Sequence, residues 1–346
     1  MSDKKQNFVA TEWVVEYMKD MMNRTGNSDF KVPKMPIPDL AKGNVGTDHD
    51  GNWTWRHLDN TQHSWRTDPD ELKQVPVNTE PVTGNNPLVV DIYDSVRSPY
   101  SYLVVPRLAW LRANYNVEVN IHVIFPIAIR TPELAGSSQK VTISGDDVAP
   151  KGGRWYFEGY MWNDTKLVAD YQGVPYKFAD PDVVIQNFWP MGPKKNPLYK
   201  ETAPIEEQIF IIWMVRLANA AELAGKSLEF LLYTGPLVYG GASKSGYWPS
   251  EIPAAFEKAT GLNYDDTIKD IQNNVEKYDA AWQGNQHDFY ATGHAGVPNM
   301  SFRGEPFFGQ DRFDYLFYRL RQNGLTKRDN PRPPIVTKPL RWPEGI

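Results

Sequence analysis

Hydrophobic residues divide the chain into a polar first quarter and a body in which strand and helix patterns alternate. Residues 88–94 read LVVDIYD, an apolar run of strand length, and residues 99–113 carry apolar side chains at helical spacing. Residues 117–125 (VEVNIHVIF) alternate with a period of two, which predicts a second strand. A strand, a helix and a strand of these lengths form a βαβ unit, so we expect two parallel strands joined by a right-handed connection.

The middle of the chain, from about residue 155 to 290, has the apolar spacing of helices. Residues 205–224 form the strongest helical pattern, and a glycine follows it as a stop signal. Two more helices are predicted over residues 249–258 and 264–282. Residues 233–248 are rich in glycine and predict a loop.

The α/β pattern returns after Gly296. Residues 299–302 and 306–308 predict a hairpin around residues 303–305, and residues 312–322 predict a last helix. A βαβ unit, a long helical insertion and a closing ββα unit together predict an α/β protein. We expect a thioredoxin-like fold with a large inserted α-helical domain.

The first 87 residues form an extended arm rather than a domain. Residues 11–22 predict an amphipathic helix with Thr11 as its N-cap, and residues 31–40 and 76–87 are proline-rich and extended. The tryptophans of this arm need burial, either on the main body or on a partner subunit, and we expect a homodimer. We divide the chain into the arm over residues 1–87, a thioredoxin-like domain over 88–325 with its insertion at about 155–290, and a proline-rich tail over 326–346.

Composition excludes several classes of function. The 346 residues include no cysteine, so the chain forms no disulfide and no zinc–thiolate site, and it does not itself exchange thiols with disulfides. The net charge of −5 argues against nucleic acid as the main partner. No apolar run is long enough to cross a membrane, and the first residues lack the apolar centre of a secretion signal. We therefore expect a cytoplasmic protein with no membrane partner.

Two further polar segments do not predict binding sites. Residues 48–50 read Asp-His-Asp, and histidines follow at positions 57 and 63, but this spacing fits no standard set of metal ligands. Residues 240–246 (GGASKSG) lack the spacing of a phosphate-binding loop and follow no strand. We predict no metal site and interpret the glycine–serine run as a lid or connector.

A serine–proline pair follows the first predicted strand and opens the first predicted helix. Ser98 and Ser101 have the S-x-x-S spacing that corresponds to the C-x-x-C of thioredoxin-like proteins. Pro99 suits the first helical position, and Ser98 is then the N-cap of its own helix. Alternatively, the positive end of the helix stabilises a thiolate that a ligand brings, and Ser98 donates its O–H to that sulfur. The local sequence leaves both interpretations open.

Two segments near the end of the chain also have two interpretations. Gly296-Val297-Pro298 precedes a predicted strand, where the proline is either cis, in a specified tight turn, or an ordinary trans proline. Residues 307–313 read FFGQDRF, and Asp311 either caps the last helix or accepts the ammonium group of a ligand. Its negative charge is favourable at a helix start in both cases.

These three elements, taken in order, resemble one group of proteins. S-P-Y-S-Y-L after a strand, G-V-P about 200 residues later and F-F-G-Q-D-R-F-D at the last helix are similar to the 2-hydroxychromene-2-carboxylate isomerases and the related kappa-class glutathione transferases. Those proteins are DsbA-like thioredoxin folds that lack the C-x-x-C motif. The resemblance covers roughly residues 88–325, and it implies glutathione as the cofactor.

The resemblance also implies roles for individual residues. Ser98 contacts the glutathione sulfur. The backbone of Val297, before a cis Pro298, pairs with the cysteinyl backbone of glutathione as an added strand does. Gln310 and Asp311 hold the γ-glutamyl end.

The chain departs from this family after the second strand, where the family carries a basic segment. Residues 130–134 here read RTPEL and residues 151–156 read KGGRWY, so Lys151 or Arg154 is the candidate for binding the glycyl carboxylate of glutathione or a substrate carboxylate. The side chains that we expect near the substrate are Tyr100, Ser101, Arg130, Trp155 and His294.

The sequence therefore predicts a glutathione-dependent isomerase or transferase for an aromatic or unsaturated organic acid in a catabolic pathway. Because the chain has no thiol, the cofactor supplies the nucleophile, and Ser98 at the helix N-terminus stabilises its thiolate. The alternative is a redox-inactive binding or scaffold protein with a thioredoxin fold, in which Ser98 is only an N-cap.

Overall fold

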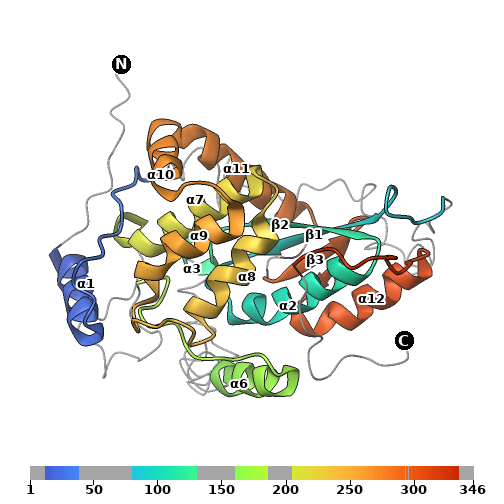
Figure 1. Cartoon of the computed structure of the whole chain (residues 1–346), viewed down its shortest axis with the longest axis horizontal. Coiled ribbons are helices and arrows are strands. Elements are labelled where there is room, and N and C mark those ends of the chain that lie inside the picture. Colours follow the sequence, from blue (N-terminus) through green and yellow to red (C-terminus); the bar gives the residue numbers. More distant parts are fainter. Residues whose placement is uncertain are drawn as a thin grey trace, which may run out of the picture.

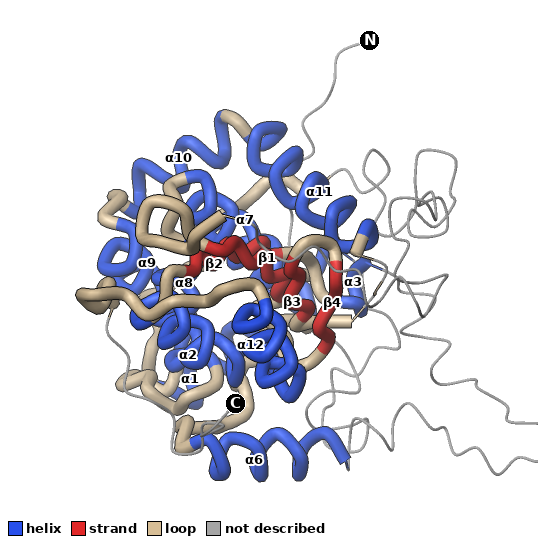
Figure 2. Tube along the Cα trace, turned by 90° about the vertical axis from the view of Figure 1, so that its right-hand side faces the viewer, coloured by secondary structure: helices blue, strands red, loops and turns tan. Residues whose placement is uncertain are grey.

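A four-stranded sheet forms the centre of the molecule, with helices on both of its faces (Figures 1 and 2). The computed structural model describes residues 12–38, 80–130, 160–185, 205–292, 294 and 296–334, and the structural statements below concern these residues. The strands, in chain order, are β1 (Leu88–Asp94), β2 (Val117–Val123), β3 (Asn299–Phe302) and β4 (Glu305–Phe308). Their order across the sheet is β2-β1-β3-β4.

The helices fall into three groups along the chain. The first group precedes or accompanies the βαβ unit and comprises α1 (Glu12–Thr25), α2 (Pro99–Asn114) and α3 (Ile127–Arg130). The second lies between β2 and β3 and comprises α6 (Met161–Gln172), α7 (Ile209–Leu223), α8 (Ser227–Val238), α9 (Ile252–Thr260), α10 (Tyr264–Asn273) and α11 (Val275–Ala291), with short 3₁₀ turns η5 (Ile205–Glu207) and η6 (Trp248–Glu251). The closing unit adds η7 (Gln310–Arg312) and α12 (Phe313–Gln322).

β1 is a central strand with a partner on each side. It runs parallel to β2 over its full length, from Leu88↔Val117 to Asp94↔Val123, which confirms the predicted parallel pair. On its other side it pairs antiparallel with β3, where Tyr93 lies opposite Asn299. Figure 2 shows α2 and α12 on one face of the sheet and α11 on the other. This arrangement of a βαβ unit, helices and a ββα unit is a thioredoxin-like fold, as the sequence predicts.

A two-residue turn joins β3 to β4. Arg303 and Gly304 both have positive φ angles, 53° and 82°, as the tight turns favoured in hairpins require. Pairing extends to Phe302↔Glu305, so β4 begins at Glu305, one residue before the predicted strand. The hairpin prediction is confirmed, and its turn is shorter than expected.

The helical insertion differs from the predicted pattern at two places. The predicted loop over residues 233–248 is wrong at its start, because α8 continues to Val238 with Pro236 inside it. Gly235, which lies inside this helix, packs closely against Tyr102. A Cβ at this position would lie 2.9 Å from the Tyr102 ring, so a larger residue does not fit without a shift. The predicted helix over residues 264–282 is broken at Asn274, which ends α10 and precedes α11.

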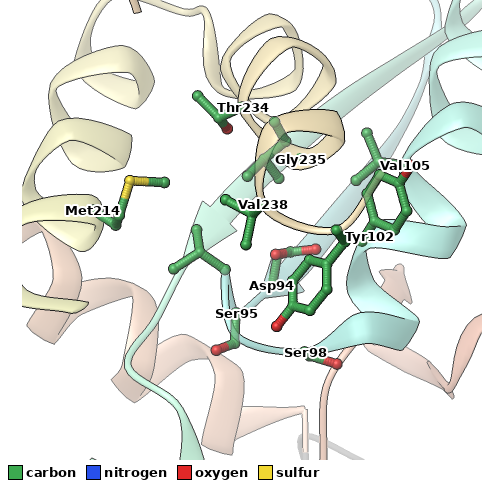
Figure 3. Close-up of a pocket in the computed structure, with 12 residues that line it drawn as sticks. Asp94, Ser95, Ser98, Tyr102, Val105, Met214, Thr234, Gly235 and Val238 are labelled. Carbon is green, nitrogen blue, oxygen red and sulfur yellow. The ribbon is translucent and has the colours of Figure 1, made fainter. Parts of the chain in front are cut away.

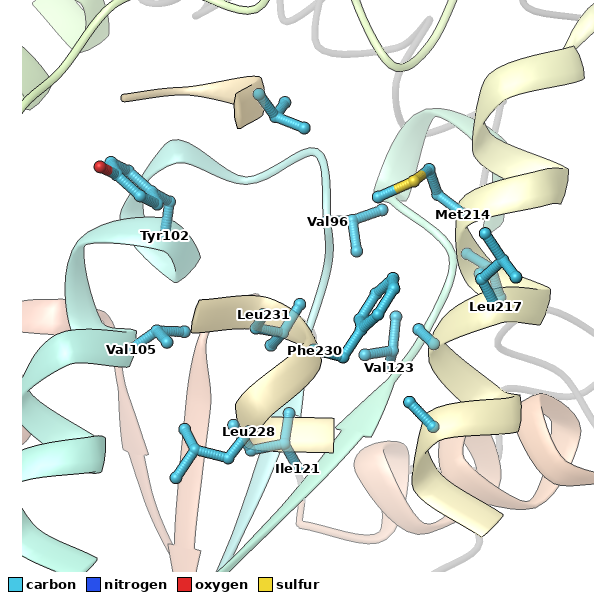
Figure 4. Packing of buried hydrophobic residues seen from close by; sticks show 14 of the residues in the cluster. Val96, Tyr102, Val105, Ile121, Val123, Met214, Leu217, Leu228, Phe230 and Leu231 are labelled. Atoms are coloured by element: carbon cyan, nitrogen blue, oxygen red, sulfur yellow. The ribbon is translucent and has the colours of Figure 1, made fainter. Parts of the chain in front are cut away.

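Helices α7 and α8 bury apolar side chains against the sheet and against each other. Figure 4 shows Phe230 and Leu231 of α8 meeting Met214 and Leu217 of α7 beside Val123 of β2. Burial of these side chains drives the docking of the helical insertion onto the βαβ unit, since apolar area removed from water contributes about 25 cal/mol per Å². The end of α7 carries the predicted stop, because Gly225 has a φ of 67°.

The described part of the arm, residues 12–38, lies on the helical insertion of the same chain. Val14, Met21 and Met35 are buried, and Phe30 packs on Trp213 with ring centroids 5.6 Å apart. The guanidinium of Arg216 donates to the backbone oxygen of Pro36 and pairs with Asp279 at 2.8 Å. These apolar side chains of the arm are therefore buried without a partner subunit. Thr11 and residues 39–79, including Trp53, Trp55 and Trp65, lie outside the described residues.

The described part of the tail closes one end of the molecule. Asn116 donates its N–H to the backbone oxygen of Thr326 at 2.9 Å, and Tyr115 forms an isolated bridge with Lys327. Arg328 donates to the backbone oxygen of Arg112 at 3.0 Å. These contacts lie at the end of α2 and the start of β2. Among the described helices, none combines the length and the apolar character needed to span a bilayer.

We expect Arg216 to hold the arm and the helical insertion together. Its side chain is fully buried, so Arg216→Met leaves the Asp279 carboxylate without its cation, with the Trp282 N–H still donating to it, and removes this donor from the Pro36 carbonyl. The loss should lower the free energy of unfolding by about 3–5 kcal/mol in a urea titration. Lys269→Met removes an exposed pair with Asp266 and should change it by less than about 0.5 kcal/mol. Equal losses in the two variants would contradict the assignment.

We also expect His122 to make stability depend on pH. Burial lowers the pKa of His122, but hydrogen bonds to the carboxylates of Asp91 and Glu222 raise it, with a net value of about 9. Because the folded pKa lies above the ordinary value of 6.5, the stabilisation is complete below about pH 6.5 and is lost as the pH rises toward 9.

The measurement is the free energy of unfolding of the protein and of His122→Gln across this range of pH. The difference between the two should shrink by about 2–3 kcal/mol from about pH 6.5 to about pH 9. His287→Asn changes an exposed histidine and should leave the pH dependence as it is. A constant difference between the protein and His122→Gln would show that the two carboxylates do not hold a charged imidazole.

Candidate functional site

The turn between β1 and α2 holds Ser98 in the N-cap position. The backbone of Ser98 is extended, with φ −83° and ψ 118°, and Pro99 occupies the first turn of the helix. Ser98 Oγ accepts the Ser101 N–H at 3.2 Å, which confirms the N-cap interpretation. This bond uses a lone pair of the hydroxyl oxygen and leaves its O–H to donate elsewhere. The capping role and a role toward a ligand are therefore compatible.

A small cavity of about 20 Å³ adjoins this turn. Figure 3 shows Asp94, Ser95 and Ser98 on one side of it and Met214, Thr234, Gly235 and Val238 from α7 and α8 on the other. The remaining lining residues are Val96, Tyr102, Val105, Leu231 and Tyr239. The cavity thus has a polar edge from the β1–α2 turn and a mostly apolar wall from the helical insertion.

Tyr102 is held in one orientation at this cavity. Its O–H donates to the backbone oxygen of Pro175 at 2.7 Å, and its ring stacks on Tyr239 with centroids 5.8 Å apart. Gly240 lies so near that a Cβ would come within 2.9 Å of the Tyr102 hydroxyl. Burial raises the pKa of Tyr102 well above its usual range, so the phenol stays neutral.

Asp94 is a buried carboxyl at the site, and its pKa is raised. It is the last residue of β1, its side chain is 1% exposed, and burial raises its pKa to about 7. The Ser101 hydroxyl lies near enough to oppose this shift slightly, although Asp94 Oδ2 and Ser101 Oγ have no hydrogen-bond partner among the described residues. Ser95 Oγ is also buried without such a partner.

The peptide bond between Val297 and Pro298 is cis, and it lies at the same end of the sheet as Ser98. Because Asn299 pairs with Tyr93, the residues just before β3 lie beside the end of β1. Val297 is half-buried and packs against a buried cluster of Tyr93, Ile124, Phe289 and Tyr290. Its backbone N–H and C=O have no hydrogen-bond partner among the described residues. Pro298 accepts the Gly309 N–H at 2.8 Å, which ties this turn to the end of β4.

Gln310 and Asp311 follow β4 at the same end of the sheet, because Phe308 pairs with Asn299. Gln310 is buried, its side chain accepts from Gln172 at 2.6 Å, and its backbone oxygen accepts from Arg107 at 3.2 Å. Asp311 is 62% exposed and makes no helix cap, since α12 begins at Phe313 without a side-chain cap. Its carboxylate lies 3.5 Å from the Arg312 guanidinium, and this exposed pair leaves it accessible to an approaching ligand.

The other predicted site residues have varied surroundings. The Tyr100 hydroxyl donates to Asp164 at 2.6 Å, and Ser101 is buried beneath the turn. His294 accepts the Gly296 N–H at 3.0 Å on Nδ1 and stacks on Phe308 at 4.1 Å. Arg130 ends α3, which follows β2 at the same sheet end, and its side chain is not described. Lys151, Arg154 and Trp155 lie outside the described residues.

The structure thus gathers Ser98, Val297, Pro298, Gln310 and Asp311 at one end of the sheet, from segments far apart in sequence. Sequence reasoning missed Asp94, Ser95 and Tyr102 as residues that line this cavity. The position of Asp94 at the end of an apolar strand, four residues before the serine, is a signal that would have indicated a buried carboxyl.

Comparison with known proteins gives matches in structure only. No family model matches the chain, and no curated protein is significantly similar to it. Among solved structures, 2-hydroxychromene-2-carboxylate isomerase is 19% identical, with a TM-score of 0.43 and coverage of 68% of this chain and 95% of that one. A probable DsbA oxidoreductase from Streptomyces coelicolor is 12% identical, with a TM-score of 0.43 and coverage of 68% of this chain and 89% of that one.

A third similar structure is DsbM, a cytosolic disulfide reductase from Pseudomonas aeruginosa, which is 17% identical, with a TM-score of 0.38 and coverage of 68% of this chain and 99% of that one. TM-scores of this size carry no argument about activity. The assignment of a thioredoxin-like fold therefore rests on the strand order and connections described above, with a helical insertion between the βαβ and ββα units.

Proposed function

We propose that the chain is a glutathione-dependent isomerase or transferase that acts on an aromatic or unsaturated organic acid. One observation carries the proposal: Ser98, at the positive end of α2, keeps an O–H to donate, and it shares a sheet end with the backbone of Val297, which has no hydrogen-bond partner among the described residues. Hydrogen-bond donors beside a helix N-terminus stabilise a thiolate. Glutathione, when bound, supplies the thiol nucleophile that this chain lacks.

Residues around the site fit a γ-glutamyl tripeptide. The unpartnered backbone N–H and C=O of Val297 suit pairing with an extended peptide, as in strand addition. The exposed carboxylate of Asp311 suits the ammonium group of the γ-glutamyl end. In this proposal Gln310 positions the backbone beside Asp311 and does not contact the ligand, because its side-chain oxygen already accepts a hydrogen bond from Gln172.

Groups of the chain itself would stabilise the negative charge on the glutathione sulfur. The Ser98 hydroxyl donates to the sulfur, and the α2 dipole adds a favourable field for negative charge. The apolar wall of Met214, Leu231 and Val238 lowers the polarity of the surroundings on the inner side of the Ser98 turn, which strengthens both effects. Lys151 or Arg154, with Arg130 and Trp155, remain our candidates for the carboxylate and ring of the substrate. A cytoplasmic homodimer is part of the same proposal.

One observation favours a second function, a redox-inactive binding or scaffold protein. The cavity beside Ser98 is about 20 Å³, which is room for a water and not for an aromatic ring. An enzyme of the proposed class needs its substrate on the outer side of the Ser98 turn. A scaffold needs no such space, and Ser98 would serve only as a helix cap.

Glutathione binding separates the two functions, and Ser98 offers a pair of variants that isolates the hydroxyl. Ser98→Ala removes both the donor and the cap, which costs about 0.5–2 kcal/mol of stability. Ser98→Asp keeps a capping oxygen but cannot donate to a thiolate and repels it. We expect titration calorimetry to show binding to the protein, about tenfold weaker binding to Ser98→Ala, and none to Ser98→Asp.

Asp311→Asn should also weaken binding by about tenfold, through loss of the charged contact to the ammonium group. Asp265→Asn is a matched control, since Asp265 is an exposed carboxylate in the first turn of α10. Absence of binding at millimolar glutathione, or equal binding by Ser98→Asp and the protein, would overturn the enzyme proposal and leave the scaffold function.

A further inference from the structure

Helix α6 contacts both ends of the candidate site. In its first turn, Asp164 accepts a hydrogen bond from the Tyr100 hydroxyl at 2.6 Å, and Tyr100 lies two residues after Ser98. At its last residue, Gln172 donates to the side chain of Gln310 at 2.6 Å. The helix therefore joins the turn that carries Ser98 to the segment that follows β4.

α6 packs on the α2 side of the sheet through one face. Figures 1 and 2 show it on the side that α2 and α12 cover, farther from the sheet than both. The packed face carries Thr165, Ala169 and Gln172, which are buried at helical spacing. Residues 164 and 172 lie about 12 Å apart along the helix axis. An extended peptide of three residues is about 10 Å long, so α6 spans the length of a tripeptide.

The segment that carries Asp311 is held at two points. Besides the bond from Gln172, the Arg107 guanidinium of α2 donates to the backbone oxygen of Gln310 at 3.2 Å and to Asp314 at 2.6 Å. Gln172 and Gln310 are buried, whereas the Asp311 side chain is mostly exposed. Because Gln310 is fixed through its side chain and its backbone, the position of the next residue depends on α6 as well as on α2.

The Gln172 amide is only half satisfied. Its Nε2 atom donates to Gln310, but its Oε1 atom is buried and has no hydrogen-bond partner among the described residues. A buried acceptor without a donor costs free energy, which offsets the gain from the one bond. An apolar side chain of the same length avoids that cost. Stability therefore explains the amide poorly, and the placement of Gln310 explains it better.

The contact at the other end of α6 involves a charge. The bond from the Tyr100 hydroxyl to the Asp164 carboxylate has the length of a strong, charge-assisted O–H···O⁻ hydrogen bond. Tyr100 lies in the first turn of α2, the end that stabilises the sulfur in the proposed function. Movement of α6 relative to α2 is therefore opposed at the end where Ser98 acts.

We propose that α6 is a brace across the glutathione site, in which Asp164 and Gln172 are positioning residues that fix the distance between Ser98 and Asp311. The inference rests on the proposed function. A thiol with a γ-glutamyl group reaches both ends at once, and a brace that holds them in place lowers the ordering cost of binding. A thiol without that group contacts only the Ser98 end and gains nothing from the brace. α6 thereby sets the preference for γ-glutamyl thiols.

The test compares glutathione with cysteinylglycine, which keeps the thiol and the glycyl end and lacks the γ-glutamyl group. Ligand-observed NMR gives the dissociation constant of each thiol for the protein and for Gln172→Met, which has a similar length and no amide. We expect Gln172→Met to bind glutathione about tenfold more weakly and cysteinylglycine as the protein does. The thermal midpoint should change little, because the lost donor to Gln310 is offset by removal of an unsatisfied oxygen.

Gln286→Met is the matched control for this variant. Gln286 is also a buried glutamine, on α11, and neither of its side-chain polar atoms has a hydrogen-bond partner among the described residues. Its replacement should leave the binding of both thiols unchanged.

Variants of Asp164 test the other attachment. Asp164→Leu should give the same selective loss of glutathione binding, whereas Asp164→Asn keeps an oxygen that accepts from Tyr100 and should bind as the protein does. Asp164→Leu combined with Gln172→Met should bind glutathione no more weakly than the more affected single variant, because a brace cut at one end is already lost. Asp170→Leu changes an exposed position on the same helix and should affect neither thiol.

Three results would overturn the brace and leave glutathione binding in place. They are equal weakening of both thiols in Gln172→Met, unchanged glutathione binding in both single variants, and additive losses in the combined variant. If the protein binds cysteinylglycine as tightly as glutathione, this inference fails while the proposed cofactor stands. If the protein binds no glutathione, the proposed function fails and this inference fails with it.

Discussion

The antiparallel pairing of β1 with β3 is the constraint on which the candidate site depends. The register that sets Tyr93 opposite Asn299 brings the cis bond before Pro298 beside the end of β1, although the two strands are about 200 residues apart. The same Asn299 pairs with Phe308, which brings Gln310 and Asp311 to that end as well. Arg107 adds a second connection, from α2 to the backbone of Gln310 and to Asp314. A slip of one residue between β1 and β3 would turn the side chains of β3 to the other face of the sheet.

The inserted helices contribute to the site rather than only adding bulk. Helices α7 and α8 supply the apolar wall of the cavity, and α8 approaches Tyr102 closely because it carries a glycine at position 235. That wall removes water from Asp94 and is the physical cause of its raised pKa. The packing of the insertion and the chemistry of the turn are therefore coupled, so a cavity made in α8 should alter the titration of a carboxyl on β1.

The buried charged groups in the described part of the chain are of two kinds, those with an ion-pair partner and those without one. The guanidinium groups of Arg97, Arg107 and Arg216 each pair with a carboxylate, and these pairs join segments that are distant in sequence. Asp94 is buried to the same degree, and no charged group among the described residues contributes to its pKa. Paired charges fix geometry, whereas an unpaired carboxyl changes its protonation state within the physiological range.

Local sequence patterns determined the elements and the cap. The period-two and helical repeats predicted β1, α2 and β2 within a few residues, and Ser98-Pro99 predicted the start of α2, because capping and φ restriction act over a few bonds. Only the tertiary structure decided the cis bond at Pro298, the continuation of α8 past Gly235 and the break at Asn274, since packing overrides propensity there. It also decided the environment of Asp94. The sequence contains a carboxyl at the end of a strand, but helices more than a hundred residues away bury it, and they place no cation beside it.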